Sequence, residues 1–273
     1  MSRRLQFALL FLIGAVTSYF GGAAYVLHFE LGRLLFPRAP ADAGPSPKAT
    51  VSFTGRLGSE LLLRRYGEQV GGCVVLFPGQ HGGAATYIPS YVAAGLEVFA
   101  MAYPGQDGAF GHTDLEEIEN LVGQALVSVE RSCKPERTVL VGVSLGATLA
   151  SYARTSARVA GLVLVSATPS LSSAINVRLR SNWYTAPLAL LPLEALLPHD
   201  YSLVEGLRQH PGVKVVVFQG TLDEQTPLKL LYKPNALPEG TEVMPVTNGT
   251  HSNTFSLSQE AQVAHTLRML RHE

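Results

Sequence analysis

The sequence predicts an α/β domain with a doubly wound, mostly parallel sheet, preceded by one N-terminal transmembrane helix. Short, nearly continuous apolar runs alternate with amphipathic stretches along most of the 273 residues, which is the pattern of strands and helices in such a fold. Hydrophobic residues make up 47% of the chain and charged residues only 15%, against about 25% charged in a typical soluble domain. Much of that apolar excess lies in the first 30 residues.

The N-terminal stretch 5–29 contains no Asp, Glu, Lys or Arg. A spanning helix needs about 20 residues to cross a hydrocarbon core of about 30 Å, so this stretch is long enough. Two arginines precede it and three basic residues follow it by position 48, which leaves only a weak charge bias for orientation. We expect residues 1–36 to form a single-pass membrane anchor, with the rest of the chain outside the cytoplasm.

A cleaved signal peptide is the alternative for the same segment. The run "FGGAA" ends in small residues that a signal peptidase could accept. The apolar stretch is, however, longer than the roughly 7–15 residues of a signal peptide, which favours an anchor. If the segment is cleaved, the protein is secreted.

Residues 37–48 hold four prolines and few apolar residues, which predicts a tether between the anchor and a domain spanning 49–273. The first two strands, 50–55 and 60–67, look like a hairpin. Helices are expected at 114–130, after Ser144, and at 258–271. The remaining strands are expected at 73–77, 96–103, 138–143, 161–167, 213–220 and 241–246.

The segment "GVSLG" places Ser144 between a predicted strand and a predicted helix. G-x-S-x-G in that context is the pattern of a nucleophile elbow, where small residues two positions away let the strand and helix backbones approach each other. The other interpretation is a structural serine in a tight turn. A serine hydroxyl needs a base, and the base needs an orienting carboxylate.

Both partners follow in chain order. Asp223 comes three residues after the strand at 213–220, in "TLDEQTP", and His251 follows the last strand, in "TNGTHSN". Both loops lie at the carboxyl ends of predicted parallel strands, where open α/β sheets form their sites. Asp223 could instead form an Asx turn or a helix cap, and Glu224 and Asp200 are the other nearby carboxylates; His251 could be a solvated loop residue.

On these motifs the chain resembles the α/β-hydrolase superfamily over roughly residues 49–270. The segments "GVSLG", "GTLDEQTP" and "GTHSN" are similar to its nucleophile, acid and histidine segments, and "FPGQHGG" and "AYPGQDG" are similar to its oxyanion loop and the turn after the next strand. The lead-in "DYSLVEGLRQHPGVKVVVFQG" resembles the membrane-anchored branch, which includes lysophospholipases and protein depalmitoylases. The chain departs from many relatives in carrying Pro78-Gly79 in place of His-Gly, with His81 displaced.

The resemblance implies a role for each matching residue. Ser144 would attack a carbonyl carbon, His251 would take its proton and pass it to the leaving group, and Asp223 would orient the imidazole. The backbone N–H groups of Leu145 and Gln80 would hold the oxyanion. Gln80 could equally be an ordinary turn residue, and His81 receives no role.

The resemblance also places the two cysteines. In the superfamily topology the strands that begin at Cys73 and shortly after Cys133 are parallel neighbours, so both thiols lie near the amino-terminal edge of the sheet. If the domain is exported, a disulfide between them is one of two interpretations that the sequence leaves open. Two unpaired, buried thiols are the alternative.

Residues 168–200 occupy the place where the superfamily inserts a cap. The stretch is rich in leucine and proline and contains Trp183 and Tyr184, which favours a small apolar cap that forms an acyl-binding wall. A helix packed on the sheet is the other interpretation. A net charge of zero gives no electrostatic footprint for nucleic acid, and the predicted chemistry needs no cofactor or metal.

The first functional hypothesis is therefore a membrane-anchored serine hydrolase that cleaves carboxylic esters or thioesters of acyl or lipid-like substrates near a membrane. Peptidase and acyltransferase activity would use the same three residues. The second hypothesis is a membrane-tethered binding module that kept the fold without catalysis. Loss of a triad member would favour the second, and the sequence retains all three.

Overall fold

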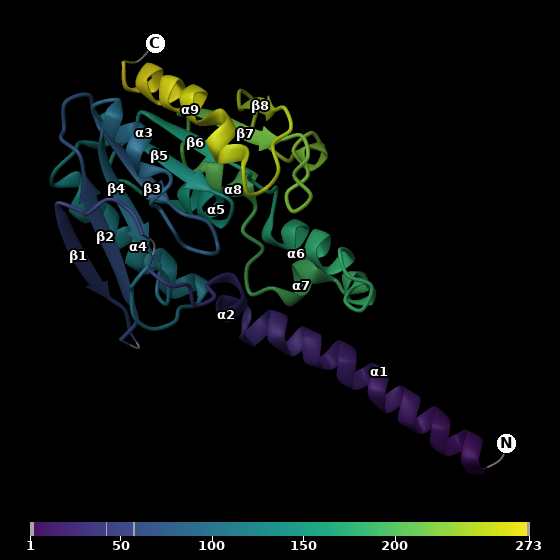
Figure 1. Ribbon diagram of the computed structural model, residues 1–273. Coiled ribbons are helices and arrows are strands. Elements are labelled where there is room, and N and C mark those ends of the chain that lie inside the picture. Colours follow the sequence, from purple (N-terminus) through teal and green to yellow (C-terminus); the bar gives the residue numbers. More distant parts are fainter. Residues whose placement is uncertain (1–2, 42, 57, 272–273) are drawn as a thin grey trace.

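One eight-stranded sheet organises the domain (Figure 1). The computed structural model describes residues 3–41, 43–56 and 58–271. The strand order is β1-β2-β4-β3-β5-β6-β7-β8. The strands are β1 Ala49–Thr54, β2 Glu60–Tyr66, β3 Cys73–Phe77, β4 Glu97–Ala102, β5 Thr138–Val143, β6 Gly161–Val165, β7 Lys214–Gly220 and β8 Glu242–Val246.

The pairing confirms the predicted mostly parallel sheet. β1 and β2 form the expected antiparallel hairpin, and β2 is antiparallel to β4. All pairs from β4 across to β8 are parallel. β3, β4, β5 and β6 are buried along their whole length, as expected for apolar strands that are covered on both faces.

Helices cover both faces of the sheet. α3 (Ile88–Ala93) and α9 (Thr254–Leu270) pack in one hydrophobic cluster, whereas α4 (Leu115–Glu130), α5 (Leu145–Tyr152) and α8 (Leu203–Arg208) pack in the other. The structure therefore has the predicted doubly wound layers. Three short 3-10 helices complete the fold: Pro135–Arg137, Ala186–Leu190 and Leu228–Leu230.

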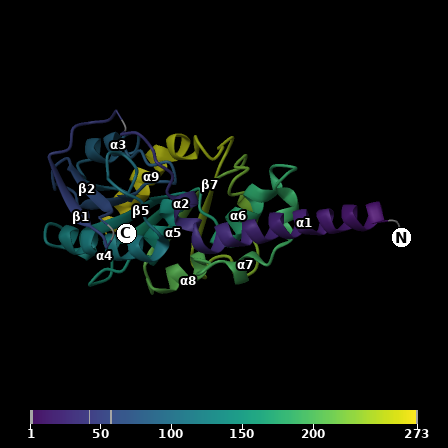
Figure 2. The same cartoon turned by 90° about the horizontal axis from the view of Figure 1, so that it is seen from below.

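α1 (Arg3–Phe29) projects from the domain as a single long helix (Figures 1 and 2). Within the described residues it is the one helix whose length and composition would allow it to cross a membrane. The short α2 (Leu31–Leu35) follows, and Leu31, Leu35 and the adjacent Phe36 are buried in the core of the domain. The chain enters the domain core directly after α1, before the proline-rich segment begins.

The proline-rich segment runs against the domain. The Ala39 N–H donates to the Gly105 carbonyl, and the Lys48 N–H donates to the Arg65 carbonyl next to β1. At residues 171–196 the chain forms α6 (Leu171–Arg180), the 3-10 turn Ala186–Leu190 and α7 (Leu193–Leu196). These elements lie beside α1 (Figure 2).

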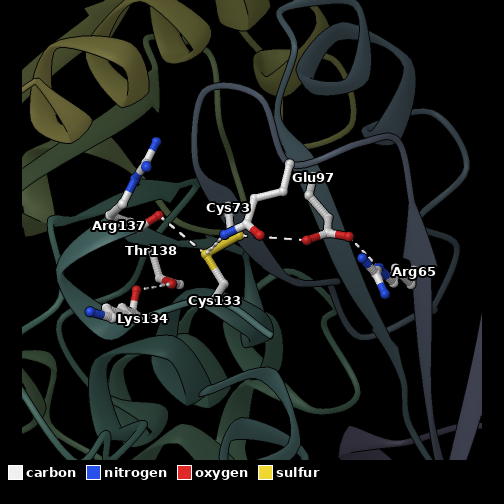
Figure 3. Close-up of a disulfide and its surroundings, with 8 residues drawn as sticks. Arg65, Cys73, Glu97, Cys133, Lys134, Arg137 and Thr138 are labelled. Atoms are coloured by element: carbon white, nitrogen blue, oxygen red, sulfur yellow. Dashed lines mark hydrogen bonds and ion pairs between the residues drawn. A yellow bond between two sulfur atoms is a disulfide. The ribbon is translucent and has the colours of Figure 1, made fainter. Parts of the chain in front are cut away.

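A disulfide joins Cys73 and Cys133, so of the two interpretations left open by the sequence the structure has the bridged one (Figure 3). Cys73 opens β3 and pairs in register with Thr138 at the start of β5. The bridge therefore lies at the amino-terminal edge of the sheet, as predicted. It ties the end of α4, through Cys133, to the central strand β3.

Candidate active site

Ser144 stands at the sharp turn between β5 and α5. Its backbone has φ 54° and ψ −117°, a strained conformation for a residue with a side chain. A Cβ on Gly142 would lie 2.4 Å from the Gly146 carbonyl oxygen, and one on Gly146 would lie 2.1 Å from that of Phe77. Both flanking glycines are therefore required for β3, β5 and α5 to approach this closely.

His251 and Asp223 meet at this turn. Ser144 Oγ lies 2.9 Å from His251 Nε2. The other ring nitrogen, Nδ1, lies 3.1 Å and 3.0 Å from the two carboxylate oxygens of Asp223. The three residues predicted from the sequence thus form one continuous hydrogen-bonded chain. The imidazole can accept from the serine hydroxyl only if it donates through Nδ1 to the carboxylate.

Asp223 is buried and heavily hydrogen-bonded. Its Oδ1 accepts from the backbone N–H groups of Gln225 (3.0 Å) and Thr226 (2.8 Å), and its Oδ2 accepts from the Thr226 hydroxyl (2.8 Å). Burial alone would raise the pKa of Asp223, but the hydrogen bonds from His251 and Thr226 hold that pKa below its ordinary value. The carboxylate therefore stays ionised next to the imidazole.

Asp223 can form the local turn and orient the imidazole at the same time. Its side chain forms the Asx-type turn onto Gln225 and Thr226 while it also accepts from His251. Asp200 is used elsewhere, because its carboxylate accepts from the N–H and hydroxyl of Ser172 in the first turn of α6.

The loop after β3 lies against the serine. A Cβ on Gly79 would lie 3.5 Å from Ser144 Cβ and 3.4 Å from the Val143 carbonyl oxygen. Gln80 is the next residue, and Leu145 opens α5 directly after Ser144. The loop that carries Gln80 thus contacts the turn at Ser144, and the oxyanion role of the Gln80 and Leu145 N–H groups stays a prediction.

Side chains that the sequence did not single out hold this loop. Gln106 Nε2 donates to the Gln80 carbonyl and, at 3.3 Å, to the Pro37 carbonyl. The Tyr103 hydroxyl donates to the Pro78 carbonyl at 3.2 Å. Gln80 Nε2 in turn donates to the Leu34 carbonyl at 2.5 Å, which links the loop to α2. His81 is exposed.

Thr226 and Gln219 are the other residues that sequence reasoning missed. Gln219 is fully buried, and its Nε2 donates to Asp223 Oδ2 at 3.4 Å and to the Thr226 hydroxyl at 3.0 Å. Thr226 stands three residues after Asp223 in the same turn, which is the one signal that could have found it. No group of three or more His, Cys, Asp or Glu within the described part of the chain could hold a metal ion.

A family model described as "Alpha/beta hydrolase family" matches residues 74–261, which include Ser144, Asp223 and His251. The chain belongs to the alpha/beta hydrolase family. Family membership places it among hydrolytic enzymes and accounts for the strand order and for the elbow after β5.

Solved structures with the same fold are distant in sequence. An esterase of Pyrococcus furiosus superposes with a TM-score of 0.61 at 17% identity, covering 86% of this chain and 97% of its own. An esterase of a Rhodococcus species gives 0.59 at 16% identity, with 81% and 98% covered. A bromoperoxidase of Bacillus anthracis gives 0.57 at 16% identity, with 82% and 100% covered. No curated protein matches the chain.

Proposed function

We propose that this alpha/beta hydrolase is a membrane-anchored serine hydrolase that cleaves carboxylic ester or thioester bonds. The observation that carries the proposal is the 2.9 Å contact between Ser144 Oγ and His251 Nε2, with Asp223 on the other ring nitrogen. This arrangement supplies nucleophile, base and orienting carboxylate in the order that acyl transfer requires. The esterases among the structures with the same fold are consistent with it.

The reaction would proceed through an acyl-enzyme. Ser144 Oγ attacks the carbonyl carbon while its proton passes to His251 Nε2, and Asp223 stabilises the resulting imidazolium. The backbone N–H groups of Leu145 and Gln80 would donate to the oxyanion, each contributing on the order of 3 kcal/mol to the lowering of the barrier. The imidazolium then protonates the leaving alcohol or thiol. Water, activated by the same histidine, releases the acid and restores the serine.

The proposed substrate has an apolar acyl group. Residues 168–200 follow β6, the strand next to the one that ends at Ser144, and the segment is rich in leucine and proline. We infer that it forms a cap with an acyl-binding wall. A lipid-like ester, such as those that lysophospholipases and depalmitoylases hydrolyse, fits both this cap and an enzyme held at a bilayer.

The proposal also includes the location of the enzyme. We infer that α1 anchors the chain in a membrane, and that the domain lies outside the cytoplasm. The disulfide between Cys73 and Cys133 supports an oxidising compartment. The unburied apolar surface of α1 supports the anchor.

A panel of p-nitrophenyl esters of increasing acyl length, together with one acyl thioester, tests the proposal. We expect the detergent-solubilised full chain to hydrolyse them, with kcat/KM rising from acetyl toward medium-chain acyl groups. Ser144→Ala and His251→Ala should abolish the activity, whereas His81→Ala, at an exposed histidine near the site, should retain it. Absence of hydrolysis across the panel would overturn the function, and a preference for acetyl would overturn the apolar acyl group.

A further inference from the structure

The cap and α1 are in direct contact. Tyr19 of α1 donates its hydroxyl to the carbonyl of Tyr184, and His28 Nδ1 lies 2.9 Å from the carbonyl of Leu196 in α7. Both contacts join the cap to the second half of α1, so the position of α1 in a bilayer also fixes the depth of the cap. Figure 2 shows α6 and α7 beside α1.

Residues 181–193, which include Tyr184, form the cap tip. It contains no charged residue, yet Trp183 is 87% exposed, Leu190 80% and Tyr184 57%. Two basic residues, Arg178 and Arg180, stand just before it at the end of α6. Trp and Tyr next to basic residues are typical of the region where head groups meet acyl chains.

Polar groups of the cap tip are bonded within the cap. The hydroxyls of Ser181 and Thr185 donate to the carbonyls of Arg178 and Leu179, both at 2.7 Å. Backbone N–H groups also donate to carbonyls within the cap: those of Thr185 and Ala186 to Asn182, that of Leu188 to Thr185, and that of Leu191 to Leu188. Satisfied backbone groups are what a segment needs where water is scarce.

The length of α1 sets how deep the cap tip lies in the bilayer. Counted from Leu5, the first residue after the two arginines, about 20 residues cross the hydrocarbon core and end near Ala24. Tyr19 then lies about five residues inside that boundary, roughly 8 Å at 1.5 Å per residue. If the cap tip stayed in water, the uncharged residues 5–18 between the two arginines and Tyr19, about 21 Å of helix, would have to cross a core of about 30 Å. His28, level with α7, lies outside the boundary.

We propose that the cap tip inserts into the interfacial layer of the same membrane leaflet from which α1 emerges, with Trp183, Tyr184 and Leu190 among the lipids. The inference rests on the anchor in the proposed function. A depth of roughly 8 Å lies within the about 5–10 Å typical of interfacial elements. Arg178 and Arg180 then lie level with the lipid phosphates.

This position brings the candidate active site toward the leaflet. α2 connects α1 to the oxyanion loop, since the Leu34 carbonyl accepts from the Gln80 side chain. The loop that contacts α2 is also the loop that lies against Ser144, so the candidate active site is on the side of the domain where α1 enters it. The substrate class that this orientation favours is an acyl ester whose chain lies in the leaflet, taken up beside the cap without first entering water.

Trp183 is the only tryptophan of the chain, so its fluorescence reports the depth of the cap tip directly. The full chain is reconstituted in phosphatidylcholine vesicles, and emission is compared with lipids brominated near the head group, lipids brominated near the chain end, and aqueous iodide. We expect strong quenching by the shallow bromine, weaker quenching by the deep bromine and little by iodide. Leu190→Asp should shift quenching from lipid to iodide, whereas Val70→Asp, at an exposed apolar residue on the loop before β3, should not.

The outcomes separate the two proposals. If alkaline washing releases the chain from the vesicles, the anchor and the inserted cap tip are both overturned. If the chain is retained but iodide quenches Trp183 and brominated lipid does not, the anchor survives and the cap-tip proposal fails. If neither reagent quenches Trp183, a second copy of the chain or another protein surface covers the tip, and the proposal again fails. The wild-type result decides even where Leu190→Asp does not fold.

Discussion

At the scale of single residues, Ser144 depends on contacts that lie well outside the pentapeptide around it. Its strained backbone is held by the close approach of Gly142 and Gly146 to neighbouring carbonyls. Its base is held through Asp223, whose two oxygens accept hydrogen bonds from one short turn. The reactive geometry is therefore distributed over three loops that only the parallel sheet brings together.

Thr226 should act as a positioning residue. Thr226→Val removes the hydroxyl that donates to Asp223 Oδ2 and keeps the side-chain volume and the backbone N–H. A hydrogen bond to a charged group contributes about 1.5–3 kcal/mol, so we expect kcat to fall roughly ten-fold or more. Thr226→Ser should restore it. Wild-type kcat in the valine variant would show that the hydroxyl does not position the carboxylate.

His210 should make the fold sensitive to mild acid. Burial lowers its pKa, partly offset by the hydrogen bond of Nε2 to the Ser151 carbonyl. The unfolded chain then binds more protons, so the free energy of unfolding should fall between about pH 7 and pH 5. His210→Gln should flatten this slope, although His265, whose pKa burial also lowers, leaves part of it.

Urea unfolding across that pH range measures the slope. The exposed His112 offers the matched control, His112→Gln, which should leave it unchanged. A slope in His210→Gln equal to that of the wild type would contradict the account of this buried imidazole.

The sequence could predict the three central residues because each follows a strand at a fixed offset. Asp223 could be separated from Asp200 only by the fold, which commits Asp200 to the start of α6. Gln106 and Gln219 lie in segments that resemble the family, but no role was predicted for their side chains, since those roles depend on which loop carbonyl or hydroxyl each amide reaches in the folded chain. Their hydrogen bonds to the loops around the site are known only from the structure.

At the scale of elements, the disulfide should matter for stability. It closes a loop of 60 residues between β3 and the segment before β5, and chain-entropy arguments give about 4 kcal/mol for such a loop. We expect Cys73→Ala/Cys133→Ala to lower the free energy of unfolding by about that amount in denaturant titrations. Reduction of the wild type should have a similar effect, and an unchanged midpoint in reductant would contradict it.

α2 should be needed by the domain even without α1. A chain starting at Glu30 keeps Leu31, Leu35 and Phe36, which are buried in the core, whereas a chain starting at Pro37 loses them. Each buried side chain of this kind contributes about 1.5–3 kcal/mol, so the shorter chain should lose roughly 5 kcal/mol or fail to fold. Equal stability of the two chains would show that α2 is dispensable.

Most of the strands could be predicted from sequence patterns, but the short helix α2 could not. The strands from β3 onward were predictable because they are short, mainly apolar runs, whereas β1 and β2 were predicted from their likeness to a hairpin. α2 was not separable from the anchor, because it is a five-residue, leucine-rich segment that begins one residue after the long apolar stretch ends. Its burial follows from packing against segments that are distant in sequence, since Gly32 lies against the Thr113 backbone and the Phe36 ring packs on Tyr103.

At the scale of the whole molecule, the alternation of strands and helices predicted a doubly wound sheet, and the sheet confirms it. The placement of β4 between β2 and β3 is not encoded in any single segment. The contact between the cap and α1 could not be predicted from sequence patterns either, because it joins residues about 165 positions apart in the chain. These long-range contacts give the proposed enzyme its orientation toward a bilayer.

Labelling with a fluorophosphonate tests the central claim most directly, because the reagent forms a stable adduct only with an activated serine. We expect that the full chain gains one phosphonyl group, that peptide mapping places it on Ser144, and that ester hydrolysis falls in proportion to labelling. Ser144→Ala should fold, remain unlabelled and lose activity by about 10⁴-fold or more. An unlabelled wild type, an adduct on another serine, or full activity in Ser144→Ala would contradict it.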